Sequence, residues 1–225
     1  MRRLSSLLLL LVLTRSASAG HFVADHALDY RTLLTPPPAA DSFVTRAELD
    51  VVLQLQDLRT PALARRAQEI ENETLFSFAA DVAGPWFAEK SLPKTAALFA
   101  AVREDFIPVN RGSKAVWPRK RPPFADARVK PCVEFSDSGS YPSGHGIQSA
   151  LWAALLGELL PEHAPGFQQR ALETRRMKLF TGVHYPSDLE AGRLVGEALA
   201  REMLKSPALQ AALGEARAEL AAVRK

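Results

Sequence analysis

Two histidines stand where the chain turns into a helix, and each has polar neighbours that could support a reaction. His145 closes the segment 141–145 (YPSGH), after which apolar residues recur at helical spacing. Ser143 and His145 therefore fall near a helix start, where free backbone N–H groups and the positive end of the helix dipole favour an anion. A serine before a helix is usually only a cap, so this signal needs support from the rest of the chain.

His184 lies in the segment 182–188 (GVHYPSD), just before a second expected helix that starts near Pro186. A neutral imidazole can attack phosphorus when an acceptor holds its other ring N–H and stabilises the positive charge that develops. Asp188, in the first turn of that helix, is placed to be this acceptor. The simpler interpretation is a surface histidine beside a first-turn aspartate.

A basic stretch precedes the serine, and two of its cations have a spacing that suits an oxyanion. Lys114 is followed after six residues by Arg121 and Pro122. A lysine offers a compact charge, and an arginine offers a planar fork that fits two phosphate oxygens. The same stretch also contains Arg119, Lys120, Arg128 and Lys130. For a charged run alone, a solvated loop is the better interpretation.

Helical periodicity accounts for most of the chain, and no run of alternating β-branched residues indicates a strand. Thr45 and Glu48 form a capping-box pattern at one helix start, and Pro61 stands at the favoured first position of the next. We expect helices over about 45–59, from 61, over 73–82, 93–106, from 143, over 166–181, from 186 and from 207. We expect a long loop over 110–141. The predicted fold is all-α, a single-domain helical bundle.

The first 19 residues have the features of a signal peptide. Arg2 and Arg3 precede an apolar run at 7–13 that is too short to span a bilayer, and small residues at 17–19 fit a cleavage site. We therefore expect residues 1–19 to be removed and the protein to be soluble, and either periplasmic or secreted. No later segment is long and apolar enough to predict a membrane helix.

Charge and cysteine content narrow the function classes. The chain has 28 basic and 25 acidic residues, but the signal peptide supplies the excess through Arg2, Arg3 and Arg15. A balanced mature chain gives no support to nucleic-acid or membrane-surface binding. Cys132 is the single cysteine, so stability must come from packing and not from an internal disulfide.

Residues 20–41 are expected to form an extended arm, and residues 42–225 the helical domain. Three prolines at 36–38 favour polyproline II, and the arm would lie over the body or reach a partner subunit. His21 and His26 lie in it. They could bind a metal, but two histidines near a terminus are more often incidental.

The three chemical signals occur in one order, Lys114-x6-Arg121-Pro122, then 142–145, then His184-x3-Asp188, with 19 and 38 residues between them. This set resembles the type 2 phosphatidic acid phosphatase superfamily, which also includes the vanadium haloperoxidases. Within it, the chain looks most like the class A bacterial non-specific acid phosphatases. The segments 138–141 and 191–193, the signal peptide, the proline-rich arm and the size fit that class. The resemblance covers nearly the whole mature chain and implies the helical fold of that superfamily.

The resemblance also implies an activity, a secreted acid phosphatase that hydrolyses small phosphate monoesters without a metal or cofactor. His184 would be the nucleophile that forms a phosphohistidine, and Asp188 would orient it. His145 would protonate the leaving alkoxide and then activate water. The phosphoryl oxygens would be held by Lys114, Arg121, Ser143 and the backbone N–H of Gly144. A homodimer is an expectation from family analogy alone.

Two positions depart from the family pattern. Lys178 stands where the family has an arginine that binds phosphate, so the charge is kept and the bidentate fork is lost. Losing one hydrogen bond to a charged group costs about 1.5–3 kcal/mol, which is roughly ten- to a hundredfold in rate. Gly146 stands where class A members usually have threonine. We therefore keep Lys178 among the expected phosphate ligands, as a weaker one.

Other functions stay open from the sequence. A vanadium-dependent haloperoxidase would use the same cradle, because vanadate resembles the pentacoordinate phosphoryl transition state, but the chain is short and resembles the phosphatases outside the motifs. A lipid phosphate phosphatase of the usual kind would have membrane helices. A low-activity phosphate-binding homologue, weakened at Lys178, is the alternative that is not an enzyme.

Two further expectations concern substrate and pH. Trp117 and Tyr185 are candidates for the wall that sets substrate preference, although aromatic residues near a site are as often core packing. His145 must be protonated to act as an acid while His184 must be neutral to attack, so an acidic pH optimum is expected.

Overall fold

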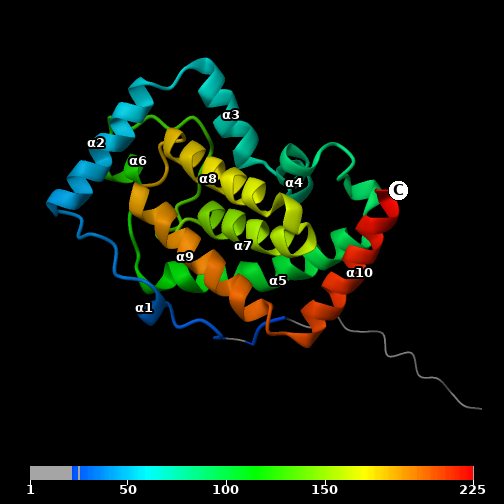
Figure 1. The fold of residues 1–225 in the computed structure, drawn as a ribbon. Helices are drawn as coiled ribbons and strands as arrows, with labels where there is room; N and C mark the ends of the chain where they lie inside the picture. Colours follow the sequence, from blue (N-terminus) through cyan, green and yellow to red (C-terminus); the bar gives the residue numbers. More distant parts are fainter. Residues whose placement is uncertain (1–21, 25, 225) are drawn as a thin grey trace, which may run out of the picture.

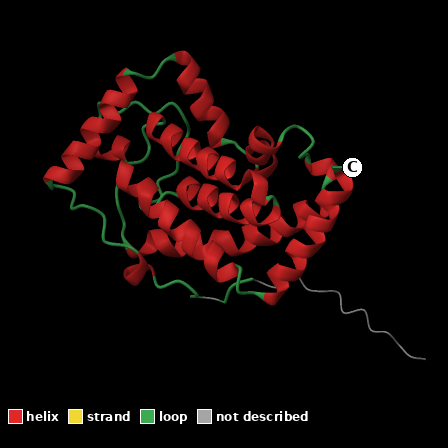
Figure 2. Ribbon diagram, in the orientation of Figure 1, coloured by secondary structure: helices red, strands yellow, loops and turns green. Residues whose placement is uncertain are grey.

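The computed structural model describes residues 22–24 and 26–224. The expected signal peptide and His21 lie outside the described residues. Within the described part the chain forms ten α-helices and no strand (Figures 1 and 2), which confirms the predicted all-α class. The helices are α1 Tyr30–Leu33, α2 Phe43–Asp57, α3 Pro61–Glu71, α4 Leu75–Ala83, α5 Pro93–Val116, α6 Pro122–Ala125, α7 Gly144–Leu159, α8 Ala164–Phe180, α9 Pro186–Met203 and α10 Pro207–Val223. None of them, within these ranges, combines the length and apolar character of a membrane-crossing helix.

Helix α7 lies at the centre of the bundle, and Figure 1 shows it beside α8 and α9. Its apolar side chains are buried around most of its circumference, including Ile147, Leu151 and Leu155. The main core joins Leu151 and Leu155 to side chains from α4, α5, α8, α9 and α10, and Ile147 belongs to a smaller second cluster. A helix buried on nearly all sides is held rigidly, so its N-terminus, which carries Ser143 and His145, has a fixed position.

Glycines bring α7 and α9 into backbone contact. A Cβ atom placed on Gly192 would lie 2.6 Å from the Ser143 carbonyl oxygen, and one placed on Gly196 would lie 2.2 Å from the Ile147 carbonyl oxygen. No larger residue fits such an approach without movement of the backbone. Gly146 faces the same interface. The contact fixes the start of α7 against the start of α9, where Asp188 lies.

Helix α5 is longer than expected. It passes through Pro108 and ends at Val116, whereas the sequence predicted a loop from residue 110. A proline inside a helix loses one backbone hydrogen bond, but α5 packs against α7, α10 and α1, and tertiary packing outweighs local propensity. Lys114 therefore lies in the last turn of a helix and not in a loop.

The start of α2 also differs from the prediction. Ser42 is the N-cap, and its Oγ accepts a hydrogen bond from the Thr45 N–H at 3.1 Å. The Thr45 hydroxyl donates to the Ala39 carbonyl oxygen at 2.8 Å. The expected capping box of Thr45 with Glu48 is therefore wrong, and Glu48 takes part in a buried network described below.

The described part of the N-terminal arm lies against the helical body. The Phe22 N–H donates to Asp105 Oδ2 at 2.7 Å, and the Tyr141 hydroxyl donates to the Thr35 carbonyl oxygen at 2.7 Å. Leu34 is 3% exposed and packs with Tyr141, near α7 and α9. The arm also contains one short helix, α1, so it is not extended throughout.

Candidate active site

One open cavity of about 540 Å³ gathers most of the residues that the motifs singled out. The last turn of α5, the loop before α6, the start of α7, the end of α8 and the loop before α9 all reach it. The expected residues that line it are Lys114, Arg121, Gly144, His145, Lys178 and His184. Ser143 and Asp188 are wholly buried. Segments far apart in the sequence therefore meet at one cavity.

His184 is held by a buried carboxylate. Its Nδ1 lies 3.3 Å from Asp188 Oδ2, which also accepts the Tyr185 N–H at 2.9 Å. Arg121 Nη1 lies 3.1 Å from His184 Nε2. An arginine can only donate, so this contact fits a neutral ring with its proton on Nδ1 and its lone pair on Nε2. Burial lowers the pKa of His184 to about 3, although Asp188 opposes the shift, so the ring is neutral above that pH.

Asp188 also has a cationic partner, Arg119, which no motif in the sequence indicates. Arg119 Nη1 donates to Asp188 Oδ1 at 2.8 Å, and Arg119 Nη2 donates to Glu48 Oε2 at 2.7 Å. Glu48 Oε1 in turn accepts the Ser187 N–H at 2.7 Å. The Arg119 guanidinium also stacks 3.9 Å from the centroid of the Tyr185 ring. We call Glu48, Arg119, Asp188 and His184 the buried network.

The buried network sets the charge of Asp188. Burial alone would raise the pKa of this carboxyl, but the hydrogen bond from His184 and the charge of Arg119 hold it below its ordinary value. Asp188 is therefore an anion, and it faces Nδ1 of the His184 ring. Nothing in the local sequence separates Arg119 from the neighbouring Lys120, which is exposed.

Lys114 and Arg121 are oriented by backbone carbonyl groups. Lys114 Nζ donates to the carbonyl oxygens of Gly139 at 2.8 Å and Pro142 at 2.7 Å. Arg121 Nε donates to the Ser138 carbonyl oxygen at 3.0 Å. Burial lowers the pKa of Lys114 to about 8, and the charge of Arg121 adds to that shift. Carbonyl groups position these cations without cancelling their charge, so both are available to an anion.

The start of α7 adds hydrogen-bond donors to the cavity. Ser143 is the N-cap, and its Oγ accepts the Gly146 N–H at 3.3 Å. This bond uses an acceptor lone pair and leaves the hydroxyl proton for another acceptor. Gly144 faces Asn110, because a Cβ on Gly144 would lie 3.0 Å from Asn110 Oδ1. That oxygen is buried and accepts no hydrogen bond from the described residues.

Lys178 differs from Lys114 and Arg121 because a carboxylate neutralises it. It is 1% exposed, and its Nζ donates to the Glu71 carboxylate. Glu71 also contacts His145, whose Nε2 lies 3.2 Å from the Glu71 carbonyl oxygen and 4.0 Å from Oε1. No motif in the sequence indicates Glu71, which is the last residue of α3. Glu71 therefore faces both Lys178 and His145.

The aromatic residues expected to wall the site lie elsewhere. Trp117 and Tyr185 line a different cavity, together with the arm residues 36–40. Tyr185 is buried, and its ring covers Arg119. The expectation that these two wall the cavity at His184 is therefore wrong. The outer wall there comes from the loop 134–138, which contributes Phe135.

In this all-helical domain, two uncompensated cations, the N-terminus of α7 and a carboxylate-held histidine converge on one cavity. This arrangement has the electrostatics of a site for phosphate-like anions. A family model described as the PAP2 superfamily matches residues 94–210, which is more than half of the chain. The protein belongs to the PAP2 superfamily. The matched region contains every site residue expected from the motifs.

Three known proteins that are similar to this chain are acid phosphatases by name. An acid phosphatase of Zymomonas mobilis subsp. mobilis is 30% identical over 188 residues, which are 80% of this chain and 69% of that protein. A non-specific acid phosphatase of Providencia stuartii is 27% identical over 208 residues, 88% of this chain and 84% of the relative. A third, from Salmonella typhi, is 26% identical over 204 residues, 87% of this chain and 82% of the relative.

Proposed function

We propose that the protein is an acid phosphatase, a phosphoric monoester hydrolase that forms a phosphohistidine at His184. The observation that carries the proposal is the placement of His184, with Nδ1 on buried Asp188 and Nε2 beside Arg121 at the cavity. The relatives named acid phosphatases match over most of this chain, which favours hydrolysis over the haloperoxidase alternative.

In the first step Nε2 of His184 attacks phosphorus, and the bond from phosphorus to the ester oxygen breaks. Lys114 and Arg121 hold the oxygens of the phosphoryl group, with donors from Ser143 and the Gly144 N–H. Because charge spreads over these oxygens in the transition state, fixed cations and N–H groups lower the barrier. His145 gives its proton to the leaving oxygen, so an alcohol departs.

In the second step water attacks the phosphohistidine. His145, now neutral, takes a proton from the water, and the bond from phosphorus to Nε2 breaks. The products are inorganic phosphate and the free His184 ring. Asp188 holds the ring in one tautomer and stabilises the positive charge that it carries while phosphorylated.

The proposed reaction needs no metal, because the cations and N–H groups of the cavity neutralise the phosphoryl oxygens themselves. The direct test is hydrolysis of p-nitrophenyl phosphate by the protein that begins at Gly20, with and without EDTA. Equal rates in both samples are expected. Activity that disappears with EDTA would reject metal independence, and no hydrolysis in either sample would reject the phosphatase activity itself.

The proposal also includes export to the periplasm or medium, which is expected from residues 1–19.

The pH dependence should have an acidic maximum. Burial and the charge of Lys178 lower the pKa of His145 from 6.5 to about 4, while Glu71 opposes the shift. Because His145 must hold its proton, kcat/KM should fall as the pH rises above about 4. His184 stays neutral there, since its pKa is lowered to about 3. Glu71→Gln removes the opposing carboxylate and should move the descending limb to lower pH, as a pH–rate profile would measure. A flat profile, or a limb that moves upward, would contradict this assignment of His145.

The alternative of a weakly active phosphate-binding homologue depends on Lys178. Lys178→Arg should raise kcat/KM by about tenfold, because an arginine can bond Glu71 and a phosphoryl oxygen at once. Lys205→Arg is the matched control, since Lys205 also pairs with a glutamate, Glu202, but is exposed. It should leave the rate unchanged. An unchanged rate in Lys178→Arg would show that the lysine does not limit turnover, and phosphate binding without turnover in both variants would favour the alternative.

A further inference from the structure

The side chain of Asn110 lines the active-site cavity, the open cavity at His184, and forms no hydrogen bond with the described residues. Its Oδ1 is wholly buried, whereas its Nδ2 is not among the buried atoms. A side-chain amide has two N–H donors and one acceptor oxygen. Native proteins pair nearly all polar groups of this kind, and an unpaired one often has a functional role. Packing alone therefore does not account for Asn110.

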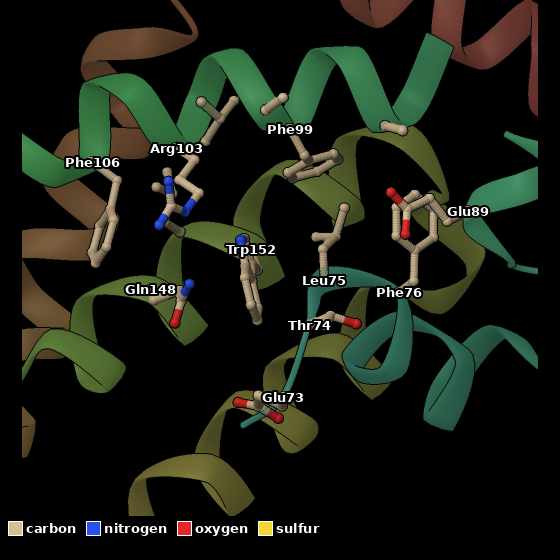
Figure 3. Close-up of a pocket in the computed structure, with 14 residues that line it drawn as sticks. Glu73, Thr74, Leu75, Phe76, Glu89, Phe99, Arg103, Phe106, Gln148 and Trp152 are labelled. Carbon is tan, nitrogen blue, oxygen red and sulfur yellow. The ribbon is translucent and has the colours of Figure 1, made fainter. Parts of the chain in front are cut away.

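Helix α5 presents Phe106, Asn110 and Lys114 on one face, because residues four apart in a helix project alike. Asn110 and Lys114 line the active-site cavity, whereas Phe106 lines a separate cavity of about 320 Å³. Figure 3 shows Arg103 in that separate cavity, near Phe106. Arg103 is two helical turns from Asn110, about 10 Å along the helix axis. The cation of α5 that precedes Asn110 on this side is therefore directed to another cavity.

The amide of Asn110 lies against Gly144, the first residue of α7. A Cβ atom placed on Gly144 would lie 3.0 Å from Asn110 Oδ1 and 3.4 Å from Nδ2. The oxygen is the negative end of the amide, and the start of α7 is the positive end of the helix dipole, so this orientation is favourable. It leaves Nδ2 for the cavity, beside the Gly144 N–H that is proposed to hold a phosphoryl oxygen.

Other polar side chains that line the active-site cavity have partners within the protein. Lys178 Nζ donates to the Glu71 carboxylate, and His145 Nε2 lies 3.2 Å from the Glu71 carbonyl oxygen. The hydroxyl oxygens of Ser136 and Ser138 lie 2.7 Å apart. In contrast, the N–H groups of the Asn110 amide have no partner among the described residues, so they are available to an anion in the cavity.

We propose that Asn110 binds the phosphoryl group of the substrate, with Nδ2 donating a hydrogen bond to a phosphoryl oxygen beside Gly144. This inference rests on the proposed phosphatase activity and adds a binding residue to it. The donor is neutral, so its contribution does not depend on its own titration. Because a donor needs only an acceptor oxygen, the same bond would form with other tetrahedral oxyanions, including sulfate.

The test measures anion binding to the protein that begins at Gly20 by isothermal titration calorimetry. Asn110→Ala should raise the Kd of inorganic phosphate and of sulfate about ten- to a hundredfold each, as expected when one hydrogen bond to a charged group is lost. The value of kcat/KM for p-nitrophenyl phosphate should fall by a similar factor. Asn110→Asp keeps the shape of the side chain but turns a negative charge to the anion, so it should weaken binding further.

Asn72→Ala is the matched control. Asn72 is exposed and lies outside the lining of the active-site cavity, and its Nδ2 donates to the Gln68 carbonyl oxygen at 3.1 Å. This amide already has a partner, so its removal should leave the Kd of both anions unchanged.

Thermal stability separates a role in binding from a role in folding. Asn110→Ala removes an unpaired buried oxygen from a helix and introduces a better helix former, so Tm should rise by about 2–4 °C while anion binding weakens. A residue that only supports the fold would lower Tm when it is replaced. A lower Tm with unchanged anion affinity in Asn110→Ala would therefore overturn the proposal.

The two anions and the assay of hydrolysis separate the remaining outcomes. A parallel loss of affinity for phosphate and sulfate supports a donor at Asn110. A loss for phosphate alone overturns it, because the amide would then accept a hydrogen bond from a protonated oxygen, which sulfate lacks. Unchanged affinity for both overturns it while the phosphatase activity stands. If wild type binds both anions but hydrolyses no p-nitrophenyl phosphate, the proposed function fails, and the calorimetry still decides the role of Asn110.

Discussion

Replacing His184 by alanine should abolish phosphate monoester hydrolysis, with a fall in kcat of at least about 10⁴-fold, as is typical when a nucleophile is removed. His184 is 3% exposed, and both ring nitrogens have partners, Asp188 on one side and Arg121 on the other. Among the described residues, His145 is the other histidine that lines the cavity, and its Nε2 is engaged with Glu71. The measurement is the steady-state rate with p-nitrophenyl phosphate.

Two further variants distinguish the loss of the nucleophile from a loss of folding. His184→Gln keeps a polar side chain in the buried position and should be as inactive as the alanine variant. His163→Ala is the matched histidine control, because His163 lies at the end of a 3₁₀ turn and contacts Phe167. It should retain full activity. Turnover that survives in a folded His184 variant, as judged by circular dichroism, would contradict a phosphohistidine at this position.

The sequence predicted the residues that line the cavity better than those that support them. Lys114, His145 and His184 could be found because each belongs to a short motif with fixed spacing. Arg119 belongs to no motif, and the only pattern that included Glu48 was the capping box that the structure contradicts. Glu48 and Arg119 are 71 residues apart in the sequence and meet only in the folded chain. A glutamate on a helix and an arginine in a basic loop have the composition of a solvated surface, so only the structure shows that they are buried.

Most helices could be predicted because their apolar periodicity and caps agree, as at the start of α3, where Thr60 is the N-cap and Pro61 the first residue. The prediction failed where packing opposed local signals. Pro108 and Gly112 favour a helix end, but α5 continues because its length is packed against neighbouring helices. Glu71 was missed for a related reason. It lies at a helix end, where a charged residue is ordinary, and its partner Lys178 comes from α8.

The cations of the site fall into two groups with different chemistry. Lys114 and Arg121 are held by carbonyl oxygens and keep their charge for a ligand. Arg119 and Lys178 are paired with carboxylates, Glu48 with the first and Glu71 with the second. The first group suits binding of a phosphoryl dianion, and the second suits positioning of the two histidines. This division cannot be inferred from the basic residues alone, because their acidic partners lie elsewhere in the sequence.

Replacing Arg119 by methionine should destabilise the protein by about 3–5 kcal/mol, because it leaves charge buried without its partner. The Asp188 side chain is 0% exposed and that of Glu48 is 11% exposed, and both would lose a hydrogen bond to the guanidinium. For a domain of this size, a loss of 1 kcal/mol lowers Tm by about 2–4 °C. The measurement is the free energy of unfolding in urea.

Arg193→Met is the matched control for Arg119→Met. Arg193 also pairs with two acidic residues, Glu190 and Glu197, but its side chain is 29% exposed. Water therefore replaces the lost contacts, and the expected loss is at most about 1 kcal/mol. Arg119→Met should in addition lower kcat in the fraction that stays folded, because Asp188 loses a partner that fixes its position against His184. Equal losses of stability in the two variants would show that the buried network contributes no more to stability than a surface pair. A large loss of stability in Arg119→Met with unchanged kcat would show that Arg119 contributes to folding and not to the reaction.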